Sequence, residues 1–154
     1  MELDVLNKKL KEFRKEFRKP VEEGKLCFYE PGLEKLTEYL YNCPDSYMFV
    51  ERGIFHRSAH HYEEAKEDFE KALMLEIIKY NEVAETAFEE LAPHKICAFI
   101  YDLANAFNRF YHETKILTEE DETRQKSYIA LLMLARRVLE TCIDMLGFEA
   151  PERM

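Results

Sequence analysis

A set of polar side chains between residues 101 and 112 has the chemistry to bind a ligand. In chain order they are Tyr101, Asn105, Asn108 and His112, with Asp102 and Arg109 at the edges. Their spacing of three and four residues puts them on one face of a helix. A face that only needs to be soluble is mostly Glu and Lys. Phenol, amide, imidazole and guanidinium groups instead stack on planar groups or form directed hydrogen bonds with them.

The element that must position these groups is a helix starting near Pro93. Its apolar residues recur every three or four positions and form one stripe: Ile96, Phe99, Ile100, Leu103, Phe107, Phe110 and Tyr111. Proline is tolerated in the first turn, because the amide that it lacks would have no partner there. The alternative is a core helix whose outer face is simply of mixed composition.

The rest of the chain also predicts helices. It has only four Gly and five Pro, and it contains no alternating β-branched run. Helices are expected over residues 2–19, 31–43, 62–80, 81–91 and 93–111, with a last one ending at Leu146 and a break at residues 20–24. Residues 62–91 form either two helices or one helix with a kink at Asn81. The expected helix caps are Asp45 or Ser46, Thr118 and Gly147. The last helix should turn Ile129, Leu132, Ala135, Leu139, Ile143 and Leu146 inward. The sequence therefore predicts an all-α fold, a bundle of about six or seven helices.

The order of motifs around the Pro93 helix resembles the DALR-type anticodon-binding domain that ends arginyl-tRNA synthetases. In that family a proline and a basic residue precede an apolar helix that closes on Phe-Asn-x-Phe-Tyr. Here residues 93–95 read Pro-His-Lys and residues 107–111 read Phe-Asn-Arg-Phe-Tyr. The Leu-Gly turn at 146–147 and the final Pro-Glu-Arg-Met are similar to how that family's chains end. The resemblance covers residues 68–154.

The resemblance implies a site for unpaired anticodon bases, whose faces stack on aromatic rings and whose edges meet amides or guanidinium groups. It makes Tyr111 the best stacking candidate, and Asn108 and Arg109 candidates for base edges or phosphate. It also implies that the chain end, including Met154, approaches the anticodon loop. The complete set of candidate RNA-binding residues is Tyr101, Asn105, Asn108, Arg109, Tyr111, His112, Arg124, Lys126 and Met154.

One position departs from the family's pattern. Where the family commonly has Arg at the start of an Arg-Leu-x-Leu run, residues 128–131 read Tyr-Ile-Ala-Leu. The missing cation puts the usual phosphate or structural contact in doubt. Arg124 or Lys126, about one turn earlier, could substitute for it.

The net charge of −9 argues against strong nucleic-acid binding. Residues 20–93 hold seven basic and seventeen acidic residues, whereas residues 94–154 hold eight and ten. The part that resembles the RNA-binding domain is therefore nearly neutral. Any affinity must come from stacking and local contacts, with few phosphate ion pairs, so we expect it to be modest.

Residues 1–19 are the basic part of the chain, with seven Lys or Arg against four Asp or Glu. Leu3, Leu6, Leu10, Phe13 and Phe17 form a heptad seam, and the basic residues occupy the remaining surface. Two interpretations stay open. The helix is either a basic arm that touches a phosphate backbone or a packing helix that its lysines keep soluble.

A second resemblance competes over residues 46–76, where Arg52-Gly53, Asp68-Phe69 and their surroundings look like one tetratricopeptide repeat. Real arrays repeat every 34 residues, and no second copy is found at that distance. A chance match on a helical hairpin is the simpler account. The alternative function that it suggests is a helical protein–protein interaction adaptor. We expect an N-terminal helical extension over residues 1–45 and the anticodon-binding-like bundle over residues 46–154.

The sequence gives little support for a metal site or for catalysis. His56 and His60 would lie one turn apart on a helix, near His61 and Glu63 or Glu64, but a surface or cap cluster fits them better than a metal site. Neither synthetase catalytic motif nor a phosphate-binding glycine loop is present, so no cofactor and no catalytic role are expected of this chain.

The predicted function is tRNA binding, as the C-terminal part of an arginyl-tRNA synthetase or as a stand-alone accessory. The unfamiliar N-terminal segment slightly favours the second. The expected partners are an arginine-accepting tRNA and a catalytic synthetase or tRNA-modifying chain. A charged N-terminus, scattered cysteines and a longest apolar run of only residues 129–135 predict a cytoplasmic protein without membrane contact.

Overall fold

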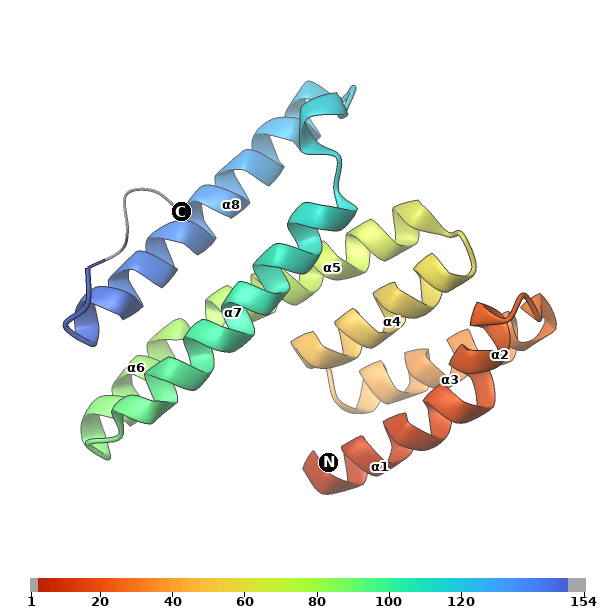
Figure 1. Ribbon diagram of the computed structural model, residues 1–154, viewed down its shortest axis with the longest axis horizontal. Coiled ribbons are helices and arrows are strands. Elements are labelled where there is room, and N and C mark those ends of the chain that lie inside the picture. The colour runs from red at the N-terminus through yellow and green to blue at the C-terminus, as the bar shows by residue number, and fades with distance from the viewer. Residues whose placement is uncertain (1–2, 150–154) are drawn as a thin grey trace. The chain divides into compact units, whose positions relative to one another are not determined.

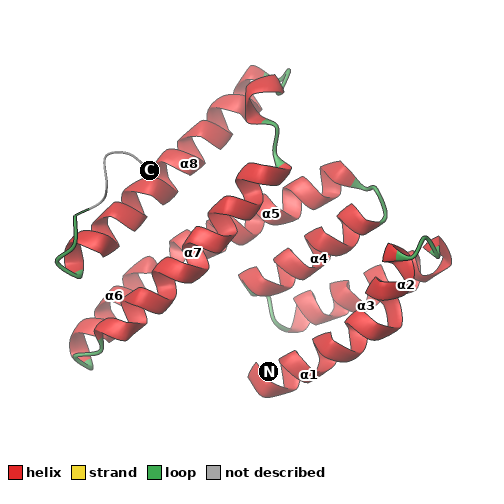
Figure 2. Cartoon of the chain, in the orientation of Figure 1, coloured by secondary structure: helices red, strands yellow, loops and turns green. Residues whose placement is uncertain are grey.

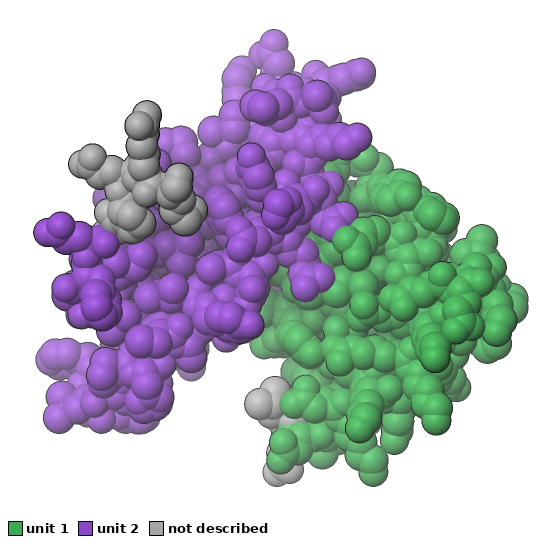
Figure 3. Space-filling view, viewed as in Figure 1, with its two compact units in different colours: residues 1–72 green, residues 73–154 purple. Residues whose placement is uncertain are grey.

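The computed structural model describes residues 3–149, which fold into helices joined by short loops (Figures 1 and 2). This described part contains no β-strand, and the predicted all-α fold is confirmed. It holds seven continuous helical stretches, over residues 3–22, 29–42, 46–58, 62–78, 80–89, 93–113 and 122–145. None of these helices has the length and apolar character needed to cross a membrane. The chain forms two compact units, residues 1–72 and 73–154 (Figure 3).

The first unit contains four long helical stretches. They are α1 (Leu3–Phe13), which continues through a π-helical turn (Arg14–Arg18) into α2 (Lys19–Glu22); α3 (Tyr29–Asn42), preceded by a 3₁₀ turn (Leu26–Phe28); α4 (Ser46–Ser58); and α5 (Tyr62–Ile78), which runs on past the unit. Their apolar stripes meet in one core: Leu6, Leu10, Phe13, Phe17, Val21, Tyr29, Leu36, Tyr39, Leu40, Met48, Phe55 and Ala59. The predicted heptad seam is thus a core-facing stripe from Leu6 onward.

The predicted break at residues 20–24 is wrong in its position, because the helix continues through Pro20 to Glu22. A proline inside a helix loses one hydrogen bond, and its ring collides with the carbonyl four residues earlier. That carbonyl belongs to Glu16, which lies in the π-helical turn. The wider turn gives the ring room. The chain reverses only at Gly24, whose φ of +86° favours glycine.

Helices α4 and α5 form the predicted hairpin. Asp45 caps α4 by accepting a hydrogen bond from the Tyr47 amide at 2.9 Å, as one of the two expected caps. The two helices approach closely at Gly53, where an added Cβ would lie 2.7 Å from the Phe69 ring. A small residue therefore faces an aromatic ring where the two helices cross.

The second unit contains the end of α5, α6 (Tyr80–Glu89), α7 (Pro93–Glu113), a 3₁₀ turn (Ile116–Thr118) and α8 (Glu122–Met145). Both α6 and α8 pack against α7. Gly147 ends α8 as predicted: its φ is +77°, and the amides of Gly147 and Phe148 donate to the carbonyls of Asp144 and Ile143.

One prediction about α8 is wrong, and a second is right only in part. Asp121, and not Thr118, caps the helix, because its carboxylate accepts from the amides of Thr123 and Arg124 at 2.8 and 3.3 Å. Thr118 instead belongs to the 3₁₀ turn, where its hydroxyl donates to the Lys115 carbonyl. The predicted inward stripe is right at Ala135, which is fully buried, and wrong at Ile129, which is 42% exposed. The other buried residues of α8 are Tyr128, Leu131 and Cys142, whereas the remaining predicted residues are only half-buried: Leu132, Leu139, Ile143 and Leu146.

Candidate nucleic-acid interface

The polar face of α7 is open to solvent within the second unit. Tyr101 and Tyr111 are 68% and 55% exposed, and Asn105, Asn108 and His112 are exposed as well. The opposite face, which includes Phe99, Leu103 and Phe110, is buried against the neighbouring helices of the unit. The predicted candidate residues on α7 are therefore surface groups, with only Arg109 half-buried.

Tyr111 is held in place by two neighbouring rings. The rings of Phe107 and Tyr111 lie parallel, with centroids 6.3 Å apart and an angle of 5° between their planes. The His112 ring meets Tyr111 edge-on at 5.9 Å. Phe107 is half-buried and so ties the exposed ring to the body of the helix. An ordered ring has less rotamer freedom to lose when a planar ligand stacks on it.

Sequence reasoning missed an apolar groove that begins at Phe107. It lies between α7 and α8, has a volume of about 250 Å³ and is lined by Phe107, Leu132, Met133, Arg136 and Leu139. The Arg136 side chain pairs with Glu140 at 2.7 Å. Residues 129–135 are apolar on every side of α8, which is the sequence signal for a second apolar face beside the buried one.

Tyr111 and Arg109 do not share a side of the helix. Residues two positions apart are separated by about 200° around an α-helix. Tyr111 lies toward the groove, with Asn108 about 60° away on the polar face. Arg109 and Asp102 lie at the far edge of that face. Tyr111 and Asn108 therefore lie on adjoining parts of the helix surface, whereas Tyr111 and Arg109 lie at opposite edges of the polar face.

The candidates on α8 lie at the same end of the unit as Tyr111. The ring of Tyr128 meets that of Phe110 edge-on at 5.4 Å, which fixes the start of α8 beside the end of α7. Arg124 is half-buried, whereas Lys126 is exposed and forms a 3.1 Å ion pair with Glu122. Exposed pairs of this kind contribute little, so Lys126 can exchange its partner at low cost. Met154 lies outside the described residues.

The departure from the family pattern at Tyr128 also has a structural account. Tyr128 is buried, and its contact with Phe110 makes it part of the core between α7 and α8. This position packs the interior of the unit and does not face a phosphate.

His56, one of the candidate metal-binding histidines, contacts a tyrosine side chain of the first unit. His56 is buried, and its Nδ1 lies 2.7 Å from the Tyr29 hydroxyl. Burial lowers the pKa of His56, although nearby Asp68 opposes the shift. Burial likewise raises the pKa of Tyr29 to about 12, so its phenol stays protonated.

The expectation that His56 and His60 share a helix is wrong. Helix α4 ends at Ser58, and His60 has a φ of +65° and bonds the Tyr62 hydroxyl. Throughout residues 3–149, no group of three His, Cys, Asp or Glu side chains is arranged to hold a metal ion.

Comparison with known proteins finds one matching family and several similar proteins. Residues 51–154, about two thirds of the chain, match the family described as "DALR anticodon binding domain". The arginine–tRNA ligase of Agathobacter rectalis is 65% identical over 85 residues, which are 55% of this chain and 14% of the ligase. That of Alkaliphilus oremlandii is 48% identical over 87 residues, 56% of this chain and 15% of the ligase. The arginine–tRNA ligase of Francisella tularensis subsp. novicida is 37% identical over 90 residues, which are 58% of this chain and 16% of the ligase.

The chain therefore spans only about one seventh of the length of these curated relatives. No solved structure matches it. The family match includes most of the hairpin with the repeat-like pattern, so the adaptor interpretation of that hairpin is not favoured. With both the expected motifs and the greater part of its length inside the match, the chain belongs to the DALR anticodon-binding domain family.

Proposed function

We propose that this chain binds tRNA at the anticodon loop through the exposed face of α7. The observation that carries the proposal is the family match over residues 51–154, which includes the whole of α7 and α8. The relatives are arginine–tRNA ligases, so the proposed ligand is an arginine-accepting tRNA.

In the proposed complex one unpaired base stacks on Tyr111. The parallel ring of Phe107 packs beside Tyr111 and limits its movement. The apolar groove between Phe107 and α8 can hold the edge of the same base or of a neighbouring base. The Asn108 amide is on the adjoining face and can donate to and accept from a base edge. A base–aromatic stack contributes about 1–3 kcal/mol, so a few such contacts suffice.

The charge balance of residues 94–154 supports recognition by stacking over recognition by charge. Eight basic residues against ten acidic ones cannot produce a strongly positive surface. Binding at this face should therefore depend weakly on salt, because few phosphates are neutralised there. Lys126 is exposed and Arg124 is half-buried at the start of α8, beside the end of α7, and both would contact the phosphates that flank the stacked base.

Aminoacylation is not proposed for this chain alone. It carries neither of the synthetase catalytic motifs, and it spans only a small share of the length of the ligases. A catalytic chain would act on the same tRNA, and a tRNA-modifying chain is the other partner that this role would suit. The proposed place of action is the cytoplasm, where tRNA is charged.

The experiment is a titration of fluorescently labelled arginine tRNA, followed by anisotropy. Tyr111→Ala should weaken binding about 5- to 150-fold, the equivalent of one stack. The matched control is Tyr41→Ala, which removes a tyrosine that is 89% exposed on α3 of the first unit. Equal affinities of both variants and the wild type would exclude Tyr111 from the site, and absence of saturable tRNA binding by the wild type would exclude the function.

A further inference from the structure

A row of lysines lies along the first helical stretch of the chain. Lys8, Lys11, Lys15 and Lys19 recur at spacings of three, four and four residues, and all four are exposed. The row runs for about 16 Å along the helix, at 1.5 Å per residue. Within the described residues none of these four lysines has an ion-pair partner. The four are called the lysine row below.

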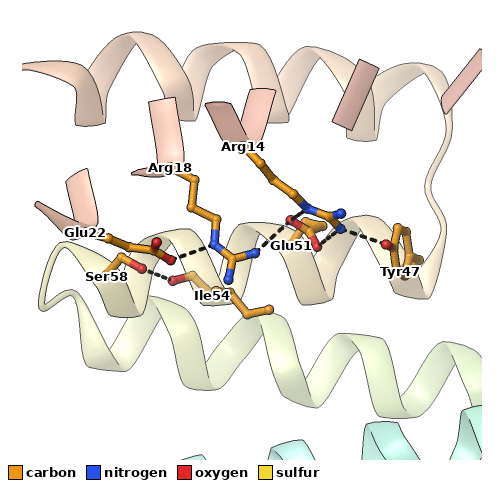
Figure 4. Close-up of polar contacts among 7 residues, drawn as sticks. All are labelled: Arg14, Arg18, Glu22, Tyr47, Glu51, Ile54 and Ser58. Atoms are coloured by element: carbon orange, nitrogen blue, oxygen red, sulfur yellow. Dashed lines mark hydrogen bonds and ion pairs between the residues drawn. The ribbon is translucent and has the colours of Figure 1, made fainter. Parts of the chain in front are cut away.

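The arginines of the same stretch do not belong to this row. Figure 4 shows Arg14 and Arg18 turned toward α4, where both bind the buried carboxylate of Glu51. Arg14 also donates to the Tyr47 hydroxyl at 2.7 Å, and Arg18 to Glu22 at 2.8 Å. The hydrogen bonds that Arg14 donates to Glu51 raise the pKa of Arg14 above its usual value. These contacts fix the helix on the unit and leave the lysines as its outward charge.

Four acidic residues share this stretch with seven basic ones, so they offset part of its charge. Asp4 and Glu12 are exposed, and Glu12 lies one turn from both Lys8 and Lys15. The other two do not oppose the row. Glu22 is held by Arg18, and Glu16 pairs with Lys35 of α3 at 3.4 Å. Lys9, the remaining lysine before the π-helical turn, lies over the Tyr39 ring at 5.3 Å instead of extending outward. The result is a local positive surface on a chain whose net charge is −9.

A polyanion fits this surface, and its class follows from the other face of the helix. A basic helix binds a membrane by inserting its apolar face between lipids. Here that face is not available, because Leu6, Leu10, Phe13 and Phe17 are buried in the core of the unit. Only the ammonium groups are presented. Each sits on a flexible stem, and Cβ atoms one turn apart are about 5–6 Å from each other, so neighbouring lysines can reach successive phosphates of a nucleic-acid strand.

We propose that the lysine row is a second RNA contact, which binds the phosphate backbone of the same tRNA away from its anticodon loop. The row lies outside the residues that match the family, so the family assignment does not supply it. This inference rests on the proposed function. The two contacts would then have different roles. Stacking at α7 selects unpaired bases, and the lysine row adds affinity that does not depend on sequence. Because one chain carries both contacts, each raises the effective concentration of RNA at the other.

The test separates the two contacts by their salt dependence, with labelled arginine tRNA titrated at several salt concentrations. Each lost phosphate contact should flatten the slope of log K against log salt by about 0.7–0.9. The double variant Lys11→Gln/Lys15→Gln should therefore reduce the slope by about 1.4–1.8. The control Lys25→Gln/Lys71→Gln changes the net charge equally, at exposed positions outside the row, and should keep the wild-type slope. Tyr111→Ala should lower the affinity and leave the slope unchanged.

Each outcome bears on one claim. Wild-type slopes in both double variants, with tRNA binding intact, would overturn the lysine row as a contact and leave the anticodon proposal standing. Equal flattening in both double variants would show a general charge effect and would also overturn it. Failure of the wild type to bind tRNA would overturn the proposed function and this inference with it. Co-sedimentation of the wild type with phosphatidylserine vesicles, abolished by the row variant alone, would assign the row to a membrane.

Discussion

Asp68 provides a sharp test of how the α4–α5 hairpin is stabilised. Its carboxylate is 3% exposed and accepts two hydrogen bonds from the Arg52 guanidinium, both 2.7 Å long. The hydrogen bonds that Arg52 donates to Asp68 raise the pKa of Arg52, so the guanidinium stays charged at neutral pH. Asp68→Ala would leave this guanidinium, with a side chain only 18% exposed, without its carboxylate.

The magnitude follows from burial. Breaking a buried ion pair by removing one partner costs about 3–5 kcal/mol, mostly because the remaining charge stays in a poorly solvated place. Arg52 retains some access to water, so the lower end, about 3 kcal/mol, is expected. For a unit of this size that loss corresponds to a fall in melting temperature of about 12–24 °C.

The assay is urea denaturation followed by circular dichroism, with hydrogen exchange of the α4 and α5 amides to assign the loss to the first unit. The matched double variant Arg52→Met/Asp68→Leu removes both charges and keeps most of the volume. It should return to within about 1 kcal/mol of the wild type. A loss below about 1 kcal/mol in Asp68→Ala would refute the reasoning, as would a double variant that is as unstable as the single one.

Three further changes have defined outcomes. Gly53→Ala should destabilise the first unit by about 1 kcal/mol in thermal unfolding, because overpacking against the buried Phe69 ring outweighs the helix preference of alanine; a more stable variant would contradict this. Since burial holds the pKa of His56 below its unfolded value, the unfolded chain binds more protons and stability should fall as the pH drops below about 6.5; a His56→Asn variant with the same pH dependence would contradict this. Tyr111→Phe should keep tRNA affinity within about twofold, because stacking needs the ring and not the hydroxyl; a loss as large as that of Tyr111→Ala would show that the hydroxyl binds.

The elements with clear periodicity could be predicted from sequence. The observed α7, Pro93–Glu113, agrees closely with the predicted 93–111, because its apolar stripe and its starting proline are both local signals. Gly147 was predicted for the same reason, since a left-handed residue after a helix strongly favours glycine. The register of α8 could not be predicted, because residues 129–135 are apolar on every side and only packing against α7 selects the buried face.

Other features depend on contacts that no local pattern contains. Pro20 reads as a break, but a π-helical turn accommodates it. Thr118 and Asp121 are both good capping residues, and the 3₁₀ turn over residues 116–118 leaves the role to Asp121.

The candidate site could also be predicted only in part. Sequence placed Tyr111 and the polar face on one helix, but the stack on Phe107 and the groove toward Met133 require the packed pair α7 and α8. The separation of Arg109 from Tyr111 around the helix is different, because it follows from spacing alone. The domain boundary near residue 46 stays a prediction, as do the roles of the individual candidate residues.

The most direct measurement compares two forms of one tRNA. In one the arginine tRNA is intact, and in the other its anticodon loop is replaced by a tight tetraloop that leaves no unpaired base to stack. We predict that the replacement lowers the affinity at least about tenfold and that Tyr111→Ala then has no further effect, because the loop and the ring are the two sides of one contact. Equal affinity for both tRNAs would contradict recognition of the anticodon loop by α7.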